Sequence, residues 1–167
     1  MLLQASEFKV GVMEIGIAIA VLFALALYSL AETMRKKRVV NMDREPTKQV
    51  IVMRNDLNMR KGKMIAQGAH ASISFLTRRI KSSGKLKVSA AEQDWLDGSF
   101  AKVCVRVDSE EELLEIFNKA KVAGLEVHLI TDSGKTEFHG EPTNTCLAIG
   151  PDVSSRIDKI TGHLQLL

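Results

Sequence analysis

The feature that most constrains this chain is an uncharged apolar run near its amino terminus, IGIAIAVLFALALYSLA at residues 15–31. A helix rises about 1.5 Å per residue, so roughly 20 residues cross the hydrocarbon core of a bilayer. Toward the amino terminus only Glu14 interrupts the run, and the basic cluster RKKR follows it at residues 35–38. The sequence therefore predicts a membrane anchor over residues 1–38, with a transmembrane helix at about 11–31 and a basic stop.

The charges on either side of this run predict its orientation. Only Lys9 is basic ahead of the run, whereas four cations follow it, so the positive-inside rule places the carboxyl-terminal domain in the cytosol. A cleaved signal peptide ending near Ala31 is the competing interpretation, but the amino-terminal flank is not net basic and the run is long for that role. A buried helix of a soluble protein is disfavoured by the uniformly apolar composition. The polar residues 39–47, which contain Pro46, indicate a linker.

Charge is divided unevenly along the rest of the chain. Between Arg44 and Lys87 there are 11 Lys or Arg residues against 2 acidic ones, whereas residues 88–167 hold 7 against 14. A basic surface suits a polyanion such as nucleic acid, although on charge alone a solvated face is an equally good interpretation. Cys104 and Cys146 each lie inside an apolar run, so we expect two buried thiols rather than a disulfide.

Residues 48–167 show alternating strand and helix patterns. Strands are predicted at 48–54, 99–107, 126–131 and 145–150, and helices at 63–82, 89–95, 108–123 and 152–164. Helices join the first three strands, which predicts parallel right-handed crossovers. A short irregular segment joins the last two, which favours an antiparallel pair. The predicted fold class is α/β: a three-layer α/β/α domain with a mixed four-stranded sheet, plus the amino-terminal transmembrane helix.

Two loops after predicted strands are candidates for chemistry, because α/β sheets bind ligands at the carboxyl ends of their strands. The first, RNDLNMRKGK, leads into a helix whose free N–H groups favour an anion, and Lys61 and Lys63 add full charges. The second, DSGKT at residues 132–136, has the composition of an ordinary turn. We nevertheless expect Asp132 at the same sheet edge as Lys61, where a carboxylate, an ammonium and the Thr136 hydroxyl can orient a water and stabilise an oxyanion.

Several other chemistries lack their motifs. Neither a Walker A loop nor the dinucleotide-binding glycine motif is present, which disfavours a nucleotide cofactor and a nucleotide-phosphate hydrolase. No histidine pairs with Cys or acidic residues at a metal-ligand spacing, and no G-x-S-x-G elbow occurs. His70, standing alone, is more often a packed core residue than a base. We therefore predict neither a metal nor a cofactor.

Four segments in this order resemble the type 2 (archaeal and eukaryotic) peptidyl-tRNA hydrolase family: QVIVMRNDLNMRKGKMIAQGAHA, GLEVHLITDSGKT, TCLAIGP and IDKITGHL. The resemblance covers residues 48–167 and implies hydrolysis of the ester that joins a peptide to the 3′ ribose of tRNA. It also implies a mixed four-stranded sheet flanked by helices, frequent homodimers and no cofactor. Some eukaryotic members carry an amino-terminal membrane segment and are linked to mitochondria. The implied location is a membrane, with the mitochondrial outer membrane as candidate and the catalytic domain in the cytosol.

The resemblance also assigns roles to residues. It implies that the catalytic residues are Lys61 (the first lysine of K-G-K), Asp132 and Thr136 of D-x-G-x-T, Thr145, and His70. Expected substrate-binding residues, for the acceptor end of peptidyl-tRNA, are Arg54, Arg60, Lys63, Gln67 and Lys135. Lys135 stands where the family often has arginine, which keeps the charge but loses the bidentate fork.

The expected chemistry is attack of water on the ester carbonyl. Asp132 would orient or deprotonate the water, and Lys61 would stabilise the oxyanion. The alternative is a catalytically weak, membrane-anchored binding or signalling module on the same fold, with the acidic helix at 108–115 as its partner surface. The intact K-G-K and D-x-G-x-T motifs favour the enzyme.

Overall fold

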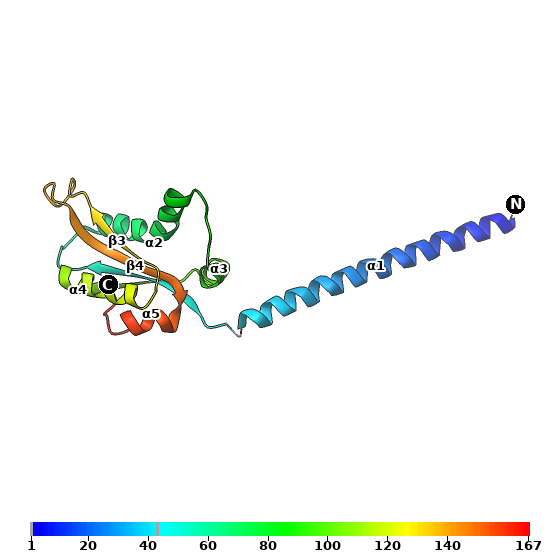
Figure 1. Cartoon of the computed structure of the whole chain (residues 1–167). Coiled ribbons are helices and arrows are strands. Elements are labelled where there is room, and N and C mark those ends of the chain that lie inside the picture. Colours follow the sequence, from blue (N-terminus) through cyan, green and yellow to red (C-terminus); the bar gives the residue numbers. More distant parts are fainter. Residues whose placement is uncertain (1, 43) are drawn as a thin grey trace. The chain divides into compact units, whose positions relative to one another are not determined.

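The computed structural model describes residues 2–42 and 44–167, in two compact units that divide between Arg44 and Glu45. The first unit is one helix, α1 (Leu2–Met42), drawn in blue in Figure 1. Within it, Ile15–Arg35 has a mean hydropathy of 2.2 over 21 residues with none of it buried, so it is long and apolar enough to cross a membrane. The side chains of residues 11–14 and 36–38, at the two ends of the predicted anchor, lie outside the described ones.

The predicted linker at residues 39–47 overlaps helix and strand at its two ends. Residues 39–42 continue helix α1, and Thr47 already belongs to the first strand. Residue 43 lies outside the described residues.

The second unit is a three-layer α/β/α domain with a mixed four-stranded sheet, as predicted. Its strands are β1 (Thr47–Arg54), β2 (Lys102–Val107), β3 (Val127–Asp132) and β4 (Thr143–Val153). Its helices are α2 (Lys61–Ser83), α3 (Ala90–Asp97), α4 (Glu110–Val122) and α5 (Ser154–Thr161). The strand order is β2-β1-β4-β3, in which β1 and β2 are parallel and β4 runs antiparallel to both of its neighbours.

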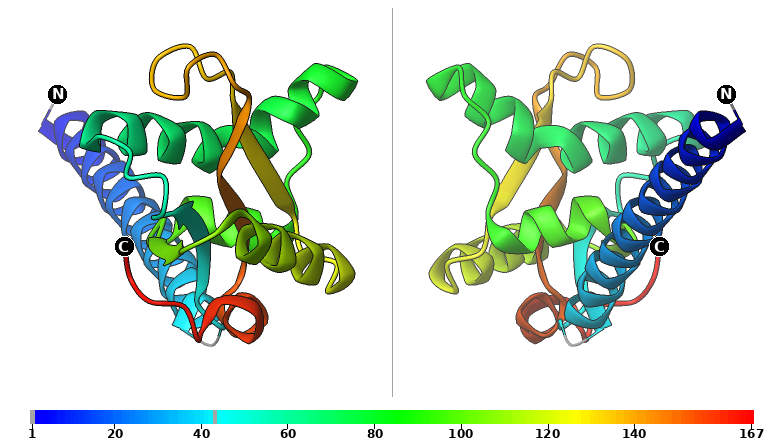
Figure 2. Two further views of the ribbon diagram at one scale, coloured as in Figure 1. Left: turned by 90° about the vertical axis from the view of Figure 1, so that its left-hand side faces the viewer. Right: turned by 90° about the vertical axis from the view of Figure 1, so that its right-hand side faces the viewer.

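Strand β1 is apolar on both faces because helices cover both faces of the sheet. Successive side chains of a strand point in opposite directions, so Val50 and Val52 pack into one core with α4 and α5, whereas Ile51 and Met53 pack into another with α2. Figures 1 and 2 show α2 on one side of the sheet and α4 and α5 on the other. A continuous apolar run is the pattern expected of such a strand.

The register of β3 against β4 shifts by one residue close to the end of β3. Ile130 is opposite Cys146, but Thr131 is opposite Asn144, which leaves Thr145 without a partner across the ladder. A bulge of this kind bends the strand and re-aims side chains. As a result, Thr145 and Cys146, although adjacent in sequence, both contact Gln67 of α2.

The carboxyl-terminal half of α2 is tied to the domain by a buried ion pair. Glu92 of α3 is only 2% exposed and receives hydrogen bonds of 2.8 and 2.7 Å from Arg79, which also pairs with Glu126. Burial raises the pKa of the Glu92 carboxyl. Hydrogen bonds from Arg79 and from the backbone of Ser89 lower this pKa by more than burial raises it, so the net shift is downward. Ser89 and Glu92 also form the capping box that begins α3.

We predict that Glu92→Ala lowers the free energy of unfolding by about 3 kcal/mol, because it leaves the Arg79 charge partly buried without its main partner. Urea denaturation at neutral pH measures this loss. The matched control is Glu111→Ala, at an exposed position of α4, which should change stability by less than about 0.5 kcal/mol. An equal loss of unfolding free energy in the two variants would contradict the conclusion that Glu92 holds α2 to the rest of the domain.

Candidate active site

A cavity of about 550 Å³ opens where β3 ends and α2 begins. It is lined by Arg60, Gly62, Lys63, Ala66, Gln67, His70, Asp132, Thr136 and Glu137. The first six come from the start of α2 and the residue before it, and the last three from the end of β3 and the loop that follows. The cavity therefore brings together the two candidate loops, whose residues Lys63 and Asp132 are 69 positions apart in the sequence.

The carboxylate of Asp132 receives three hydrogen bonds at this point. Lys63 Nζ donates to Oδ2 over 2.6 Å, and Gln67 Nε2 donates to the same oxygen over 2.7 Å. The backbone N–H of Gly134 donates to Oδ1 over 2.9 Å, which fixes the turn after β3. The side chains of Lys63 and Asp132 are only 11% and 13% exposed, so this ion pair is largely shielded from solvent.

The hydrogen bond from Lys63 lowers the pKa of Asp132, and the bonds from Gly134 and Gln67 act in the same direction against the opposing effect of burial. Asp132 is therefore a carboxylate at neutral pH. A carboxylate with a lowered pKa is a weak base but a good acceptor, which suits it to hold a water molecule or a positive charge in position.

Lys63 also donates to Thr136 Oγ1 over 2.8 Å, and its ammonium lies 5.5 Å from the centre of the Phe138 ring. An ammonium has three donors, of which Asp132 and Thr136 take two. The third is available for a substrate oxygen.

Gln67 is held by the bulge in β4. Its side chain is 2% exposed, and its Oε1 accepts a hydrogen bond of 2.8 Å from the hydroxyl of the fully buried Thr145. With the amide oxygen occupied in this way, the amide nitrogen is directed toward Asp132. Thr145 thus orients Asp132 through Gln67 rather than by direct contact.

The domain that holds this cavity is similar to known proteins. Residues 47–167 match the family model described as peptidyl-tRNA hydrolase PTH2. A peptidyl-tRNA hydrolase of Methanocaldococcus jannaschii is 50% identical over 122 residues, which cover 72% of this chain and 99% of that protein. A peptidyl-tRNA hydrolase of Methanothermobacter thermautotrophicus is 48% identical over 120 residues, with coverage of 72% and 99%. The chain belongs to the peptidyl-tRNA hydrolase PTH2 family.

The lysine beside Asp132 in this family member is Lys63, not Lys61 as we expected from the sequence. Lys61 lines a separate cavity of about 540 Å³. The physical reason is that α2 begins at Lys61 itself, two residues earlier than predicted. Two residues are separated by roughly 200° around a helix of 3.6 residues per turn, so the two lysines leave it on different sides. Lys63, Gln67 and His70, at spacings of four and three, share one face.

Among the other expected residues of this peptidyl-tRNA hydrolase, Arg54 is placed elsewhere. Its side chain is 10% exposed and pairs with Asp56 at 2.6 Å and Glu110 at 3.0 Å, so its charge is used inside the fold. Arg54 does not line the cavity around Asp132, and its role in substrate binding stays a prediction. Lys135 is exposed in the loop after β3 but does not line the cavity, whereas His70 does.

Glu137 is a cavity residue that the sequence analysis missed. Its side chain is 14% exposed and accepts a 2.7 Å hydrogen bond from Nε of Arg60, whose own side chain is 79% exposed. The acidic residue follows Thr136 directly, but it lies in an irregular turn, so periodicity gave no signal. Arg60 lies at the mouth of the cavity, as expected of a substrate-binding residue.

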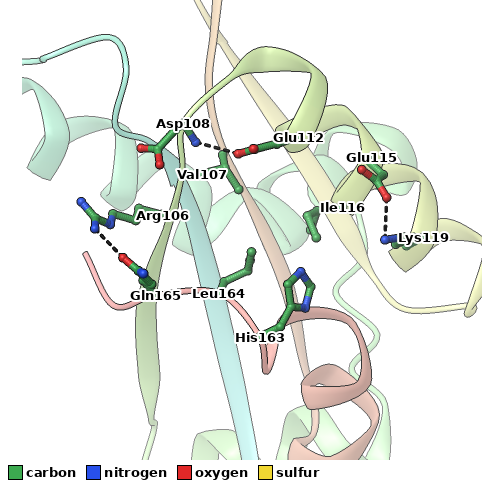
Figure 3. A pocket seen from close by; sticks show the side chains of 10 residues that line it. All are labelled: Arg106, Val107, Asp108, Glu112, Glu115, Ile116, Lys119, His163, Leu164 and Gln165. Atoms are coloured by element: carbon green, nitrogen blue, oxygen red, sulfur yellow. Dashed lines mark hydrogen bonds and ion pairs between the residues drawn. The ribbon is translucent and has the colours of Figure 1, made fainter.

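A further cavity of about 330 Å³ lies on the other face of the sheet, beside the acidic helix α4 (Figure 3). Within it Glu115 forms an ion pair with Lys119, and Arg106 donates a hydrogen bond to the amide oxygen of Gln165. It contains none of the residues around Asp132.

The described residues hold no group of three His, Cys, Asp or Glu side chains suited to a metal ion. Cys146 is buried, which raises its thiol pKa to about 12. Cys104, which we expected to be buried, is exposed on β2.

We predict that Lys63→Ala raises the pKa of Asp132 toward its ordinary value, whereas Lys61→Ala leaves it unchanged. Carboxyl-detected NMR titration of the full-length chain measures both. Because the folded-state pKa is lowered, the pair stabilises the fold fully above the unfolded pKa of about 3.9, and that stabilisation is lost as the pH falls through the lower folded value. An equal rise in both variants would contradict the geometry.

Proposed function

We propose that this chain cleaves the ester bond of peptidyl-tRNA at the Lys63–Asp132 pair. Membership of the family and the close relatives named peptidyl-tRNA hydrolase support the activity and the substrate. The observation that carries the assignment of the site is the 2.6 Å contact between Lys63 Nζ and Asp132 Oδ2 inside a cavity large enough for a substrate group.

In the proposed reaction, water adds to the ester carbonyl of the peptide. Asp132 holds the water, and the third donor of Lys63 stabilises the negative charge that develops on the carbonyl oxygen. The bond to the ribose oxygen then breaks, the proton lost by the water goes to that oxygen, and peptide acid and free tRNA leave. Gln67 and Thr145 act as positioning residues, because the Gln67 amide donates to the Asp132 carboxylate and the Thr145 hydroxyl holds the Gln67 amide oxygen.

His70 and Thr136 stay proposed members of the site. Thr136 fixes the ammonium of Lys63 and can share the oxyanion, and His70 lines the cavity one helical turn beyond Gln67. Arg60 is proposed to meet tRNA phosphate at the cavity mouth, in exchange for its contact with Glu137. The alternative of a binding or signalling module is not favoured, since the charged groups are assembled and buried together.

We predict that Asp132→Asn and Lys63→Ala each lower kcat for peptidyl-tRNA by about 10² to 10⁴-fold, the range lost when a positioned proton acceptor or an oxyanion donor is removed. The readout is release of peptide from purified N-blocked peptidyl-tRNA. Lys81→Ala, an exposed lysine in the last turn of the same helix, is the matched control and should retain kcat. Retention of kcat in Lys63→Ala would remove Lys63 from the mechanism.

We also propose that α1 anchors the enzyme in a membrane, with the catalytic domain on the cytosolic side. The 21-residue apolar stretch Ile15–Arg35 and the basic residues that follow it support this orientation. The mitochondrial outer membrane is the candidate, from the resemblance to eukaryotic members. A homodimer is proposed on the same ground, and sedimentation analysis tests it.

We predict that the full-length chain stays in the membrane pellet after alkaline carbonate extraction, whereas a variant lacking residues 2–42 is soluble and hydrolyses peptidyl-tRNA. The relatives align with this chain over only about 120 residues, yet 99% of their own length, which indicates that the second unit suffices for catalysis. Protease added outside sealed mitochondria should digest the domain. A mature amino terminus near Ala31 would instead identify a cleaved signal peptide.

A further inference from the structure

One strip of the sheet on the α2 side is left open. A helix with its side chains is about 10 Å wide, whereas four strands spaced about 4.8 Å apart form a wider surface. Helix α2 packs over β1, β3 and β4, and the edge strand β2 lies beyond it. The result is an apolar groove of about 540 Å³, lined by Ile51, Met53, Lys61, Met64, Ile65, Gly68, Ala69, Ser72, Lys102, Cys104 and Leu167.

The groove is apolar, and the charged side chains that line it are both lysines. Ile65 is 73% exposed on its rim, which is unusual for an isoleucine of a helix packed on a sheet. The two charged side chains that line it, Lys61 and Lys102, are both lysines, whereas the cavity on the other side of α2 contains Asp132 and Glu137. Lys102 is held in place by aromatic rings, with its Nζ 3.2 Å from the centre of Phe100 and 4.6 Å from that of Trp95.

These charges distinguish between the possible occupants. A two-fold symmetric dimer built on this groove would bring the lysines of both copies into one interface, with no acidic side chain of the groove to pair them, which is unfavourable. A nascent peptide has no obligatory negative charge, and its sequence varies. The tRNA acceptor end has one phosphate per nucleotide and exposed base faces in every substrate, which matches an apolar groove with a cation at each side.

The groove and the active-site cavity are separated only by the thin start of α2. The residues at the ridge are small: Gly62 and Ala66 line the cavity, and Ala69 lines the groove. A side chain added at Gly62 would meet nothing within 4 Å, so the space above the ridge is open. A substrate strand can therefore cross the helix there and reach both sides.

We propose that the groove between α2 and β2 binds the single-stranded 3′ end of the tRNA. Bases pack against Met64 and Ile65, while Lys61 and Lys102 pair with the backbone phosphates. The strand then crosses the ridge and places the ester at the Lys63–Asp132 pair. This inference rests on the proposed function and gives Lys61 a role in substrate binding rather than in catalysis.

The test compares the binding of two probes by the full-length chain in detergent: a deacylated tRNA with its complete 3′ end, and the same tRNA without the unpaired terminal nucleotides. Wild type should bind the complete tRNA more tightly. Lys61→Ala/Lys102→Ala should lose that preference, and the slope of log K against log salt should fall by about 0.7 for each lysine. The matched control is Lys121→Ala, which removes a lysine 5.3 Å from the Phe117 ring on α4 and should leave the preference intact.

A double variant that keeps the wild-type preference would overturn the inference. Two further results would identify another occupant of the groove. If the double variant keeps the tRNA preference but its kcat/KM falls only for long peptides, the groove binds the peptide. If it keeps the tRNA preference but no longer forms dimers in sedimentation, the groove binds a second copy of the chain.

Failure of the proposed function is distinguishable, because the binding readout does not require turnover. Asp132→Asn should abolish hydrolysis yet retain the preference for the complete 3′ end. Absence of hydrolysis by wild type would reject the function and leave the binding result to be judged by itself.

Discussion

The arrangement of the active site depends on one ion pair between residues that are 69 positions apart, Lys63 at the start of α2 and Asp132 at the end of β3. Burying an ammonium and a carboxylate is costly unless each finds its partner and further hydrogen bonds. Both conditions are met here, since Gln67 and Gly134 also donate to the carboxylate and Thr136 accepts a second hydrogen bond from the ammonium, whose third donor is left for the substrate. The pair is therefore formed before substrate arrives, which is the condition for electrostatic stabilisation of a transition state.

The rest of the domain fixes the geometry of that pair. Helix α2 is held at its far end by the buried Arg79–Glu92 contact and along its length by the sheet. The bulge in β4 turns Thr145 toward Gln67. The hydrogen bond from Thr145 then orients the Gln67 amide toward Asp132. The geometry of the active site thus depends on contacts between residues far apart in the sequence rather than on one local loop.

Much of the fold could be predicted from the sequence because its signals are local. The strand and helix patterns of residues 48–167 and the short connection before β4 predicted the elements and the mixed sheet. The choice between Lys61 and Lys63 failed because it depends on the first residue of a helix, and an error of two residues changes the side from which a lysine projects. The spacing of Lys63, Gln67 and His70 could have identified Lys63, since helical residues four and three positions apart share a face.

Other features could not be predicted from sequence patterns. The exposure of Cys104 depends on which strands α2 covers. The pairing of Arg54 with Glu110 depends on the end of β1 meeting the start of α4, and the bulge at Thr145 is defined only by the register of β3. A double-mutant cycle on kcat tests most directly whether Lys63 and Asp132 act as one unit. Our account predicts that Lys63→Ala/Asp132→Asn loses little more activity than either single variant. Losses that simply multiply would show that the two groups act independently and would contradict it.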